Sequence, residues 1–191
     1  MYIIAEFSHK NGKDFILKNH PSEFDEIKHV IAEIDAEKFK TKISKEKTMP
    51  GKVLYSPTEL NEEFRKRFEA LGWRSVRINV QTFVPETGET SVGFREMDFV
   101  KNKLGLEIQF GKYAFMVYNV LAKGTIFARR GIIDSLVEVT PMKDMAEEMS
   151  TGVSFFEMVK TDLEQRGESE IDIPTLLLGV DVVKRGKQAT L

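Results

Sequence analysis

Two segments with strict alternation of apolar and polar residues require this chain to form a sheet. In 104–110 the even-numbered residues are apolar and would share one face of a strand, whereas Glu107 and Gln109 would point to the other. Ser75–Val84 alternates in the same way, and 175–183 is largely apolar, which is typical of a buried strand. Segments with helical spacing separate these strands, so we predict a mixed α/β fold.

The same periodicities predict elements along the whole chain. Strands are expected at 1–8, 75–84, 104–110, 132–139 and 175–183, and helices at 24–39, 57–71, 112–123, 142–149 and 154–165. We find no internal repeat, low-complexity tract or linker, so we expect a single domain over residues 1–191.

The helix expected at 57–71 has the clearest limits. Ser56 can cap its first turn, Glu59 is placed to reach back to the Ser56 amide, and Gly72 can end it in a left-handed conformation. One stripe of this helix is expected to enter the core: Leu60, Phe64, Phe68 and Leu71.

Composition limits the chemistry and the compartment. The chain has no cysteine, which excludes disulfides, zinc sites with cysteine ligands, iron–sulfur clusters and thiol nucleophiles. The start of the chain carries Glu6 where a signal peptide carries bases, and no apolar run approaches the roughly 18 residues of a membrane span. We therefore expect a cytoplasmic protein without membrane contact.

Positive charge is concentrated although the net charge is only −2. Residues 38–52 contain six lysines and a single acid, Glu46, which suits a surface that faces phosphates. A lysine-rich loop is more often an ordinary solvated surface, and charge alone favours that interpretation.

Two carboxylates are expected to meet at a strand pair. The polar turn at 101–103 would return the chain in a hairpin and bring Asp98 beside Glu107. Their oxygens, with the backbone carbonyl of Ile108, suit Mg²⁺ and predict phosphodiester hydrolysis. An exposed strand face without a metal would show the same spacing, so that alternative stays open.

Other polar residues give weaker signals. The three histidines lie at positions 9, 20 and 29 without the spacing of metal ligands, so surface or packing roles are expected. Asn79 is on the polar side of its strand, where it could contact DNA or simply face solvent.

The segments Met97–Lys101 and Leu106–Tyr113 together resemble the active-site segment of the BglII/BstYI-type restriction endonucleases, with the BstYI pattern nearer. This group is a branch of the PD-(D/E)xK nucleases in which glutamine takes the place of the usual lysine. The likeness covers nearly the whole chain, because further segments resemble the family in the same order: Ile34–Glu37, Thr41–Lys42, Ser44–Thr48, Leu54–Pro57, Leu60–Glu62, Gly72–Trp73, Pro141–Lys143 and Met149–Ser154.

The resemblance implies a restriction endonuclease-like fold, a central mixed sheet flanked by α-helices, and a type II restriction endonuclease. Asp98 and Glu107 match the metal-binding carboxylates of the family, and Gln109 matches the third position of its motif. The residues expected near double-stranded DNA are Lys112, Ser150, Thr151, Gly152 and Ser154.

The family also implies a homodimer with Mg²⁺ as cofactor and a cognate DNA methyltransferase as partner. The expected site is a palindrome containing GATC, cut to leave 5′ overhangs. The chain differs from the family in two places that bear on which DNA site is preferred. These are the short connection at 85–90, and Thr151 where serine is expected. A DNA-binding protein without cleavage and a less specific nuclease of repair or phage DNA processing are the alternatives.

Overall fold

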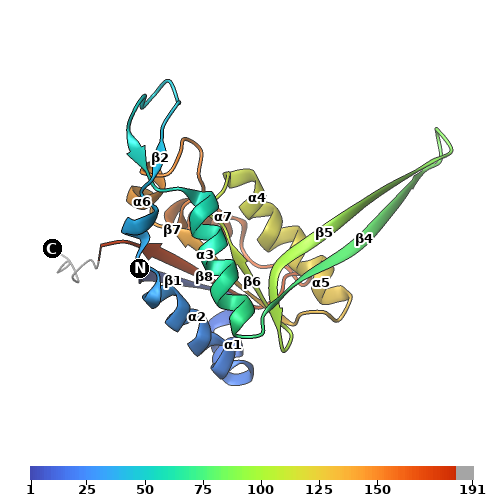
Figure 1. Ribbon diagram of the computed structural model, residues 1–191. Coiled ribbons are helices and arrows are strands. Elements are labelled where there is room, and N and C mark those ends of the chain that lie inside the picture. Colours follow the sequence, from blue (N-terminus) through green and yellow to red (C-terminus); the bar gives the residue numbers. More distant parts are fainter. Residues whose placement is uncertain (184–191) are drawn as a thin grey trace.

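The computed structural model describes residues 1–183, apart from the side chains of Tyr113 and Ala114. Its centre is a six-stranded sheet in the order β1-β8-β7-β6-β5-β4, and helices cover it on both faces (Figure 1). The strands of this sheet are β1 (Tyr2–His9), β4 (Arg74–Val84), β5 (Glu89–Lys101), β6 (Leu104–Ile108), β7 (Ser135–Pro141) and β8 (Thr175–Asp181). The sheet is mixed, because β6, β7 and β8 run parallel whereas the pairs β4–β5, β5–β6 and β1–β8 are antiparallel. The predicted α/β class and mixed sheet are confirmed.

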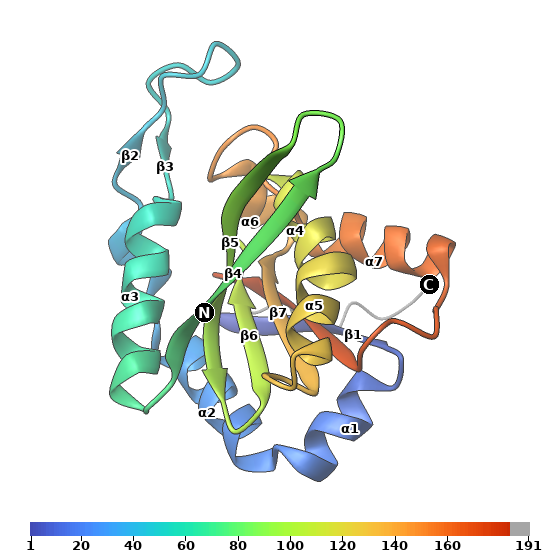
Figure 2. The ribbon, with the colours of Figure 1, turned by 90° about the vertical axis from the view of Figure 1, so that its right-hand side faces the viewer.

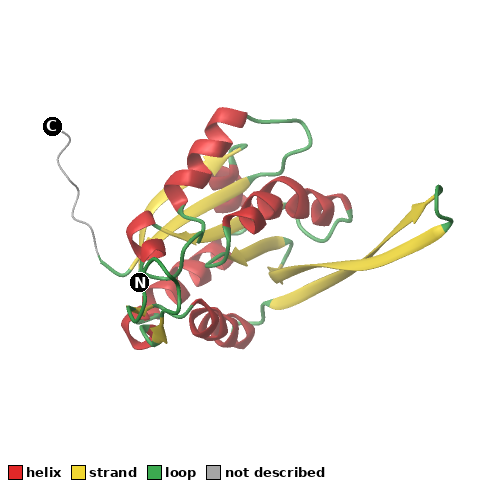
Figure 3. Cartoon of the chain, turned by 90° about the horizontal axis from the view of Figure 1, so that it is seen from above, coloured by secondary structure: helices red, strands yellow, loops and turns green. Residues whose placement is uncertain are grey.

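Helices form two layers around this sheet. They are α1 (Gly12–Asn19), α2 (Pro21–Glu33), α3 (Pro57–Ala70), α4 (Tyr113–Tyr118), a π-helical turn (Asn119–Lys123), α5 (Gly124–Arg129), α6 (Lys143–Glu147) and α7 (Phe156–Arg166). Apolar side chains of α2 and α3 pack on one face of the sheet, and those of α4, α5 and α7 pack on the other. Seen from above, helices lie on both sides of the strands (Figure 3). None of these helices within residues 1–183 is long and apolar enough to cross a membrane.

The core follows the periodicity of the sequence. Leu104, Leu106 and Ile108 of β6 lie in one cluster with the apolar stripe of α3. Leu60, Phe64 and Phe68 of that stripe are fully buried, whereas Leu71 ends the helix and is 37 % exposed, so its predicted core position is wrong. The Ser56 cap is present, but Glu59 does not reach back, since its carboxylate accepts a hydrogen bond from Thr41.

Other boundaries differ from the prediction for local reasons. The helix expected at 24–39 ends at Glu33 because Ile34 is extended (φ −77°, ψ 116°), and a 3₁₀ turn follows at Ala36–Phe39. The helix expected at 112–123 continues through the π turn to Arg129. Helix α1 was not predicted, and of strand β5 only the end that forms the hairpin with β6 was expected.

Two projections leave the body of the molecule. The strands β2 (Lys42–Ile43) and β3 (Val53–Leu54) pair and close the lysine-rich segment into a ribbon, which we call the finger (residues 42–54). The hairpin of β4 and β5 extends well beyond the other strands, and we call residues 79–94 the arm. Figure 2 shows the finger and the arm as separate extensions. The connection at 85–90 contains the tight end of this hairpin.

Candidate active site

A tight hairpin brings two carboxylates together at the edge of the parallel strands. Asn102 and Lys103 both have positive φ (47° and 69°), which lets a two-residue turn join β5 to β6. The backbone N–H of Asp98 then donates to Glu107 Oε1 at 3.1 Å, and the N–H of Ile108 donates to Asp98 Oδ2 at 3.2 Å. Each carboxylate is therefore oriented by the backbone beside the other one.

Glu107 is more deeply buried than expected from its position on the polar face of β6. It is 2 % exposed, because the π turn and its flanking helices cover this face of β6. Lys123 Nζ lies 2.7 Å from Glu107 Oε1 and is itself buried. A buried carboxylate needs such a partner, since an unpaired charge in the interior costs several kcal/mol.

Asn119 links the polar groups of the site. Its Nδ2 lies 3.1 Å from Gln109 Oε1, 3.3 Å from Glu138 Oε1 and 3.4 Å from Glu107 Oε2. Since the Gln109 oxygen accepts this hydrogen bond, the groups that Gln109 can donate are the hydrogens on its Nε2. The amide thus presents a donor beside the two carboxylates.

Asn119 and Lys123 were not identified from the sequence. They begin and end the π-helical turn, and π turns are rare and often found at functional sites. The available signal was their spacing, because they are four residues apart and are polar within an otherwise apolar helical segment.

Glu138 was also missed, and it is completely buried beside Glu107 on the neighbouring strand. Its Oε2 has no hydrogen-bond partner among the described residues. Burial raises the pKa of Glu138 to about 8, although Lys123 and the hydrogen bond from Asn119 act in the opposite direction. Burial and the nearby Asp98 charge raise the pKa of Glu107 well above its usual range.

The donor set fits a hard divalent cation. Mg²⁺ typically uses one or two protein carboxylates and completes its shell with water and phosphate oxygens, so Asp98, Glu107 and the Ile108 carbonyl suffice. Within residues 1–183, no group of three or more acidic or histidine side chains is arranged so that all of them could bind one metal ion. Asp98 opens onto a cleft of about 110 Å³ that is also lined by Asn61 and Arg65 of α3.

The residues expected near DNA lie at different depths. Lys112, Thr151 and Gly152 are exposed, and Ser150 is half-buried. Ser154 is fully buried, and its hydroxyl donates to the Gly111 carbonyl at 3.2 Å. In this conformation Ser154 supports the loop from beneath and does not reach the surface.

Asn79 and the histidines lie away from the carboxylate pair. Asn79 is exposed on β4, where it pairs with Phe94 in the arm. His9 is buried against Asp172 at 2.9 Å, and His20 is buried against Asp134 at 2.8 Å. These two histidines have packing roles, as predicted.

The fold of this chain, a mixed six-stranded sheet between helices, is shared with a solved structure. The structure is similar to the crystal structure of free BglII, with a TM-score of 0.64 and 15% sequence identity over 98% of this chain and 82% of that chain. A search of curated protein sequences found no significant match.

Residues 4–180 match the model of the restriction endonuclease BglII/BglIII family. The chain belongs to this family, and it is a nuclease of the restriction endonuclease class. Its predicted relation to the BglII group is thereby confirmed.

Proposed function

We propose that this protein is a Mg²⁺-dependent type II restriction endonuclease that hydrolyses both strands of double-stranded DNA within a palindrome containing GATC and leaves 5′ overhangs. The observation that carries the proposal is the carboxylate pair of Asp98 and Glu107, which backbone N–H groups orient at 3.1 and 3.2 Å. The family supports DNA as the substrate. The GATC core rests on the sequence resemblance to BstYI-type enzymes.

In this proposal each polar side chain has a separate task. Asp98, Glu107 and the Ile108 carbonyl would hold Mg²⁺, which would supply charge neutralisation at the phosphate and a lowered pKa of bound water. Gln109 orients the attacking water through its Nε2 hydrogens, because an amide does not titrate and cannot serve as a base. Asn119 and Lys123 keep Gln109 and Glu107 in place.

The proposed DNA surface is the end of the molecule that carries the finger and the turn at 150–152. Lys112 is exposed directly before α4 and forms an isolated β-bridge with Val153, which follows that turn. The bridge connects the turn with the segment that follows Gln109. We propose that Lys112, Ser150, Thr151 and Gly152 contact DNA, and that Asn79 contributes from the arm.

A homodimer would match the two-fold symmetry of a palindrome. Phe115 of α4 is 62 % exposed, and an apolar side chain of this size at the surface is suited to an interface. We propose α4 as part of the contact between subunits, and a DNA methyltransferase that protects the same site as the functional partner.

Digestion of unmethylated phage DNA in Mg²⁺ tests the proposal, with sequencing of the fragment ends and Glu107→Ala as the inactive control. We expect discrete fragments from the wild type only, with GATC at their ends. A smear would indicate a less specific nuclease. Bound but intact DNA would indicate a DNA-binding protein without cleavage.

A further inference from the structure

Glu46 is the one acid among the six lysines of residues 38–52. Both oxygens of its carboxylate accept hydrogen bonds from the turn at 150–152, and Lys42 Nζ lies 3.9 Å from Oε1. Oε1 accepts a hydrogen bond from the Ser150 hydroxyl. Oε2 accepts from the Thr151 N–H at 2.9 Å and from the Thr151 hydroxyl at 2.5 Å. These donors lower the pKa of Glu46 to about 2, so the carboxylate is ionised under ordinary conditions.

Neighbouring contacts join the same two segments. Lys42 Nζ donates to the Met149 carbonyl at 2.9 Å, and the hydroxyls of Thr48 and Thr151 lie 3.2 Å apart. The finger and the turn are therefore joined mainly by polar contacts that converge on Glu46 and Thr151.

Core packing fixes the two ends of the turn, where Met149 and Val153 are buried, but not its tip. A hollow of about 580 Å³ lies between the finger and the turn, with Met49, Phe155 and Met158 in its lining. Thr151 and Gly152 are exposed above it. Because apolar side chains leave this space open, the hydrogen bonds to Glu46 hold the exposed tip of the turn between its two buried ends.

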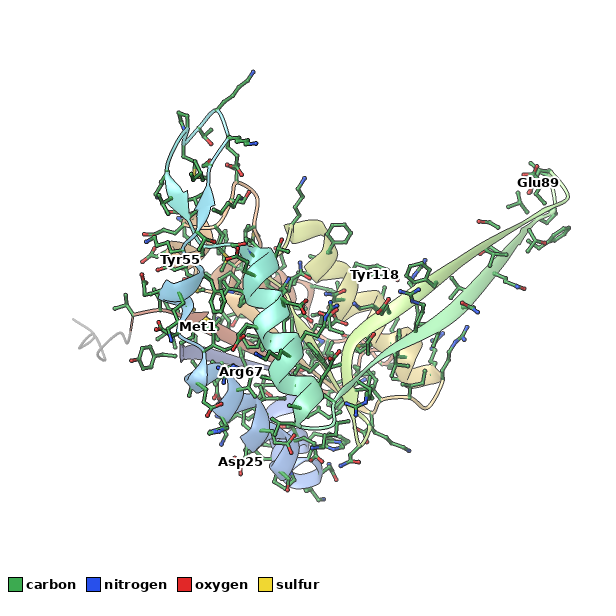
Figure 4. All side chains as sticks on the ribbon, viewed as in Figure 1. Met1, Asp25, Tyr55, Arg67, Glu89 and Tyr118 are labelled. Carbon is green, nitrogen blue, oxygen red and sulfur yellow. The ribbon has the colours of Figure 1, made fainter. Side chains whose placement is uncertain are left out.

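An acid on a surface that binds phosphates is unfavourable unless its charge serves another purpose. Lys45, Lys47 and Lys52 leave the finger strongly positive, and they are exposed. Glu46 differs from them because its oxygens point into the turn. Figure 4 shows the long side chains of the finger, which extend from the end of the molecule opposite to Asp25.

We propose that Glu46 is a positioning residue for base recognition. It holds the turn at 150–152 against the finger, so that the turn is in place to contact bases only while its hydrogen bonds with the finger are intact. This inference rests on the proposed function, in which that turn contacts DNA. It assigns the finger to the DNA backbone and couples its position to the choice of bases.

Steady-state cleavage of two sets of duplexes tests the proposal. One set contains the palindrome identified from fragment ends, and the other has one of its central base pairs exchanged. We expect Glu46→Ala to lower the ratio of kcat/KM between the two sets by about 10–100-fold, the range of a lost base contact. Glu46→Gln retains an acceptor for the Thr151 N–H and gains a donor for Ser150, so its loss is expected to be intermediate.

Controls separate positioning from charge and from folding. Asp25→Asn also neutralises one exposed carboxylate, at the opposite end of the molecule, and is expected to keep the wild-type ratio. Thermal unfolding of the Glu46 variants should match the wild type within a few degrees. If Glu46→Ala and Glu46→Gln both bind every duplex more tightly and discriminate equally well, Glu46 acts through repulsion and the proposal is overturned.

The inference and the proposed function fail in different ways. A wild type that cleaves both sets equally contradicts the proposed site specificity. A wild type that discriminates, with a Glu46→Ala variant that discriminates as well, contradicts the positioning role alone.

Discussion

Asn119 donates from one amide nitrogen towards three oxygens, those of Glu107, Gln109 and Glu138. Replacement by leucine keeps the approximate volume but removes these hydrogen bonds. We expect Asn119→Leu to lower the cleavage rate about 10–100-fold, the usual cost of removing a group that orients metal ligands. DNA affinity measured in Ca²⁺ should remain at the wild-type value, because Asn119 is buried. An equal loss of affinity and rate would contradict this role.

Glu138 makes stability depend on pH. Its pKa is raised from 4.5 to about 8 on folding, so between these values the folded protein keeps a proton that the unfolded chain has released. The stabilisation is complete below pH 4.5 and is lost as the pH rises through about 8, with a slope of up to about 1.4 kcal/mol per pH unit.

Urea unfolding at pH 5.5 and 7.5 measures this effect. Glu138→Gln should lose less stability between the two conditions than the wild type does. Some slope should remain, because the pKa of Glu107 is raised as well. Glu164→Gln, at an exposed position of α7, should keep the wild-type slope. An unchanged slope in Glu138→Gln would show that Glu138 is ionised in the folded protein.

At the scale of elements, α1 depends on a close approach to β8. A Cβ atom at Gly12 would lie 2.3 Å from the backbone oxygen of Thr175. Gly12→Ala is therefore expected to cost about 1–3 kcal/mol, as in other overpacked sites, or several degrees in Tm. Gly93→Ala in the arm is the matched variant, since its Cβ would have no neighbour within 3.8 Å and should not lower Tm. Equal melting temperatures would contradict the packing of α1.

The elements with regular periodicity could be predicted, and those set by tertiary contacts could not. Alternation identified β6, and the turn residues predicted its hairpin with β5, which places Asp98 beside Glu107. The outer half of β5 was missed because it pairs only within the arm and lacks the apolar face of a buried strand.

The two carboxylates of the site were predicted from the sequence, but the residues that surround and orient them were not. Asp98 and Glu107 follow from local sequence, whereas Lys123 and Glu138 reach Glu107 from a distant helix and a neighbouring strand. Their burial depends on how α4, the π turn and α5 cover the sheet. A polar residue in an apolar helix indicates such a role only after that packing is known.

At the scale of the whole molecule, the proposed homodimer predicts a defined mass and a defined interface. Sedimentation in solution should give twice 21.9 kDa. Phe115→Glu should shift the protein towards the monomer, because it places a charge on the proposed contact surface of α4. Leu17→Glu alters another exposed apolar residue, on α1, and should leave the mass unchanged. A monomeric wild type on DNA would contradict the dimer.

The most direct test of the account is single-turnover cleavage of the identified palindrome in Mg²⁺ by Asp98→Asn, with Asp25→Asn as the control. Both variants neutralise one carboxylate, but only Asp98 belongs to the oriented pair. We predict that the Asp98→Asn rate falls at least about 10²–10³-fold, as when a charge-stabilising group is removed from other active sites. The control should cleave at the wild-type rate, and DNA affinity in both variants should persist. Cleavage by Asp98→Asn at the wild-type rate would contradict the central claim that this carboxylate pair carries the chemistry.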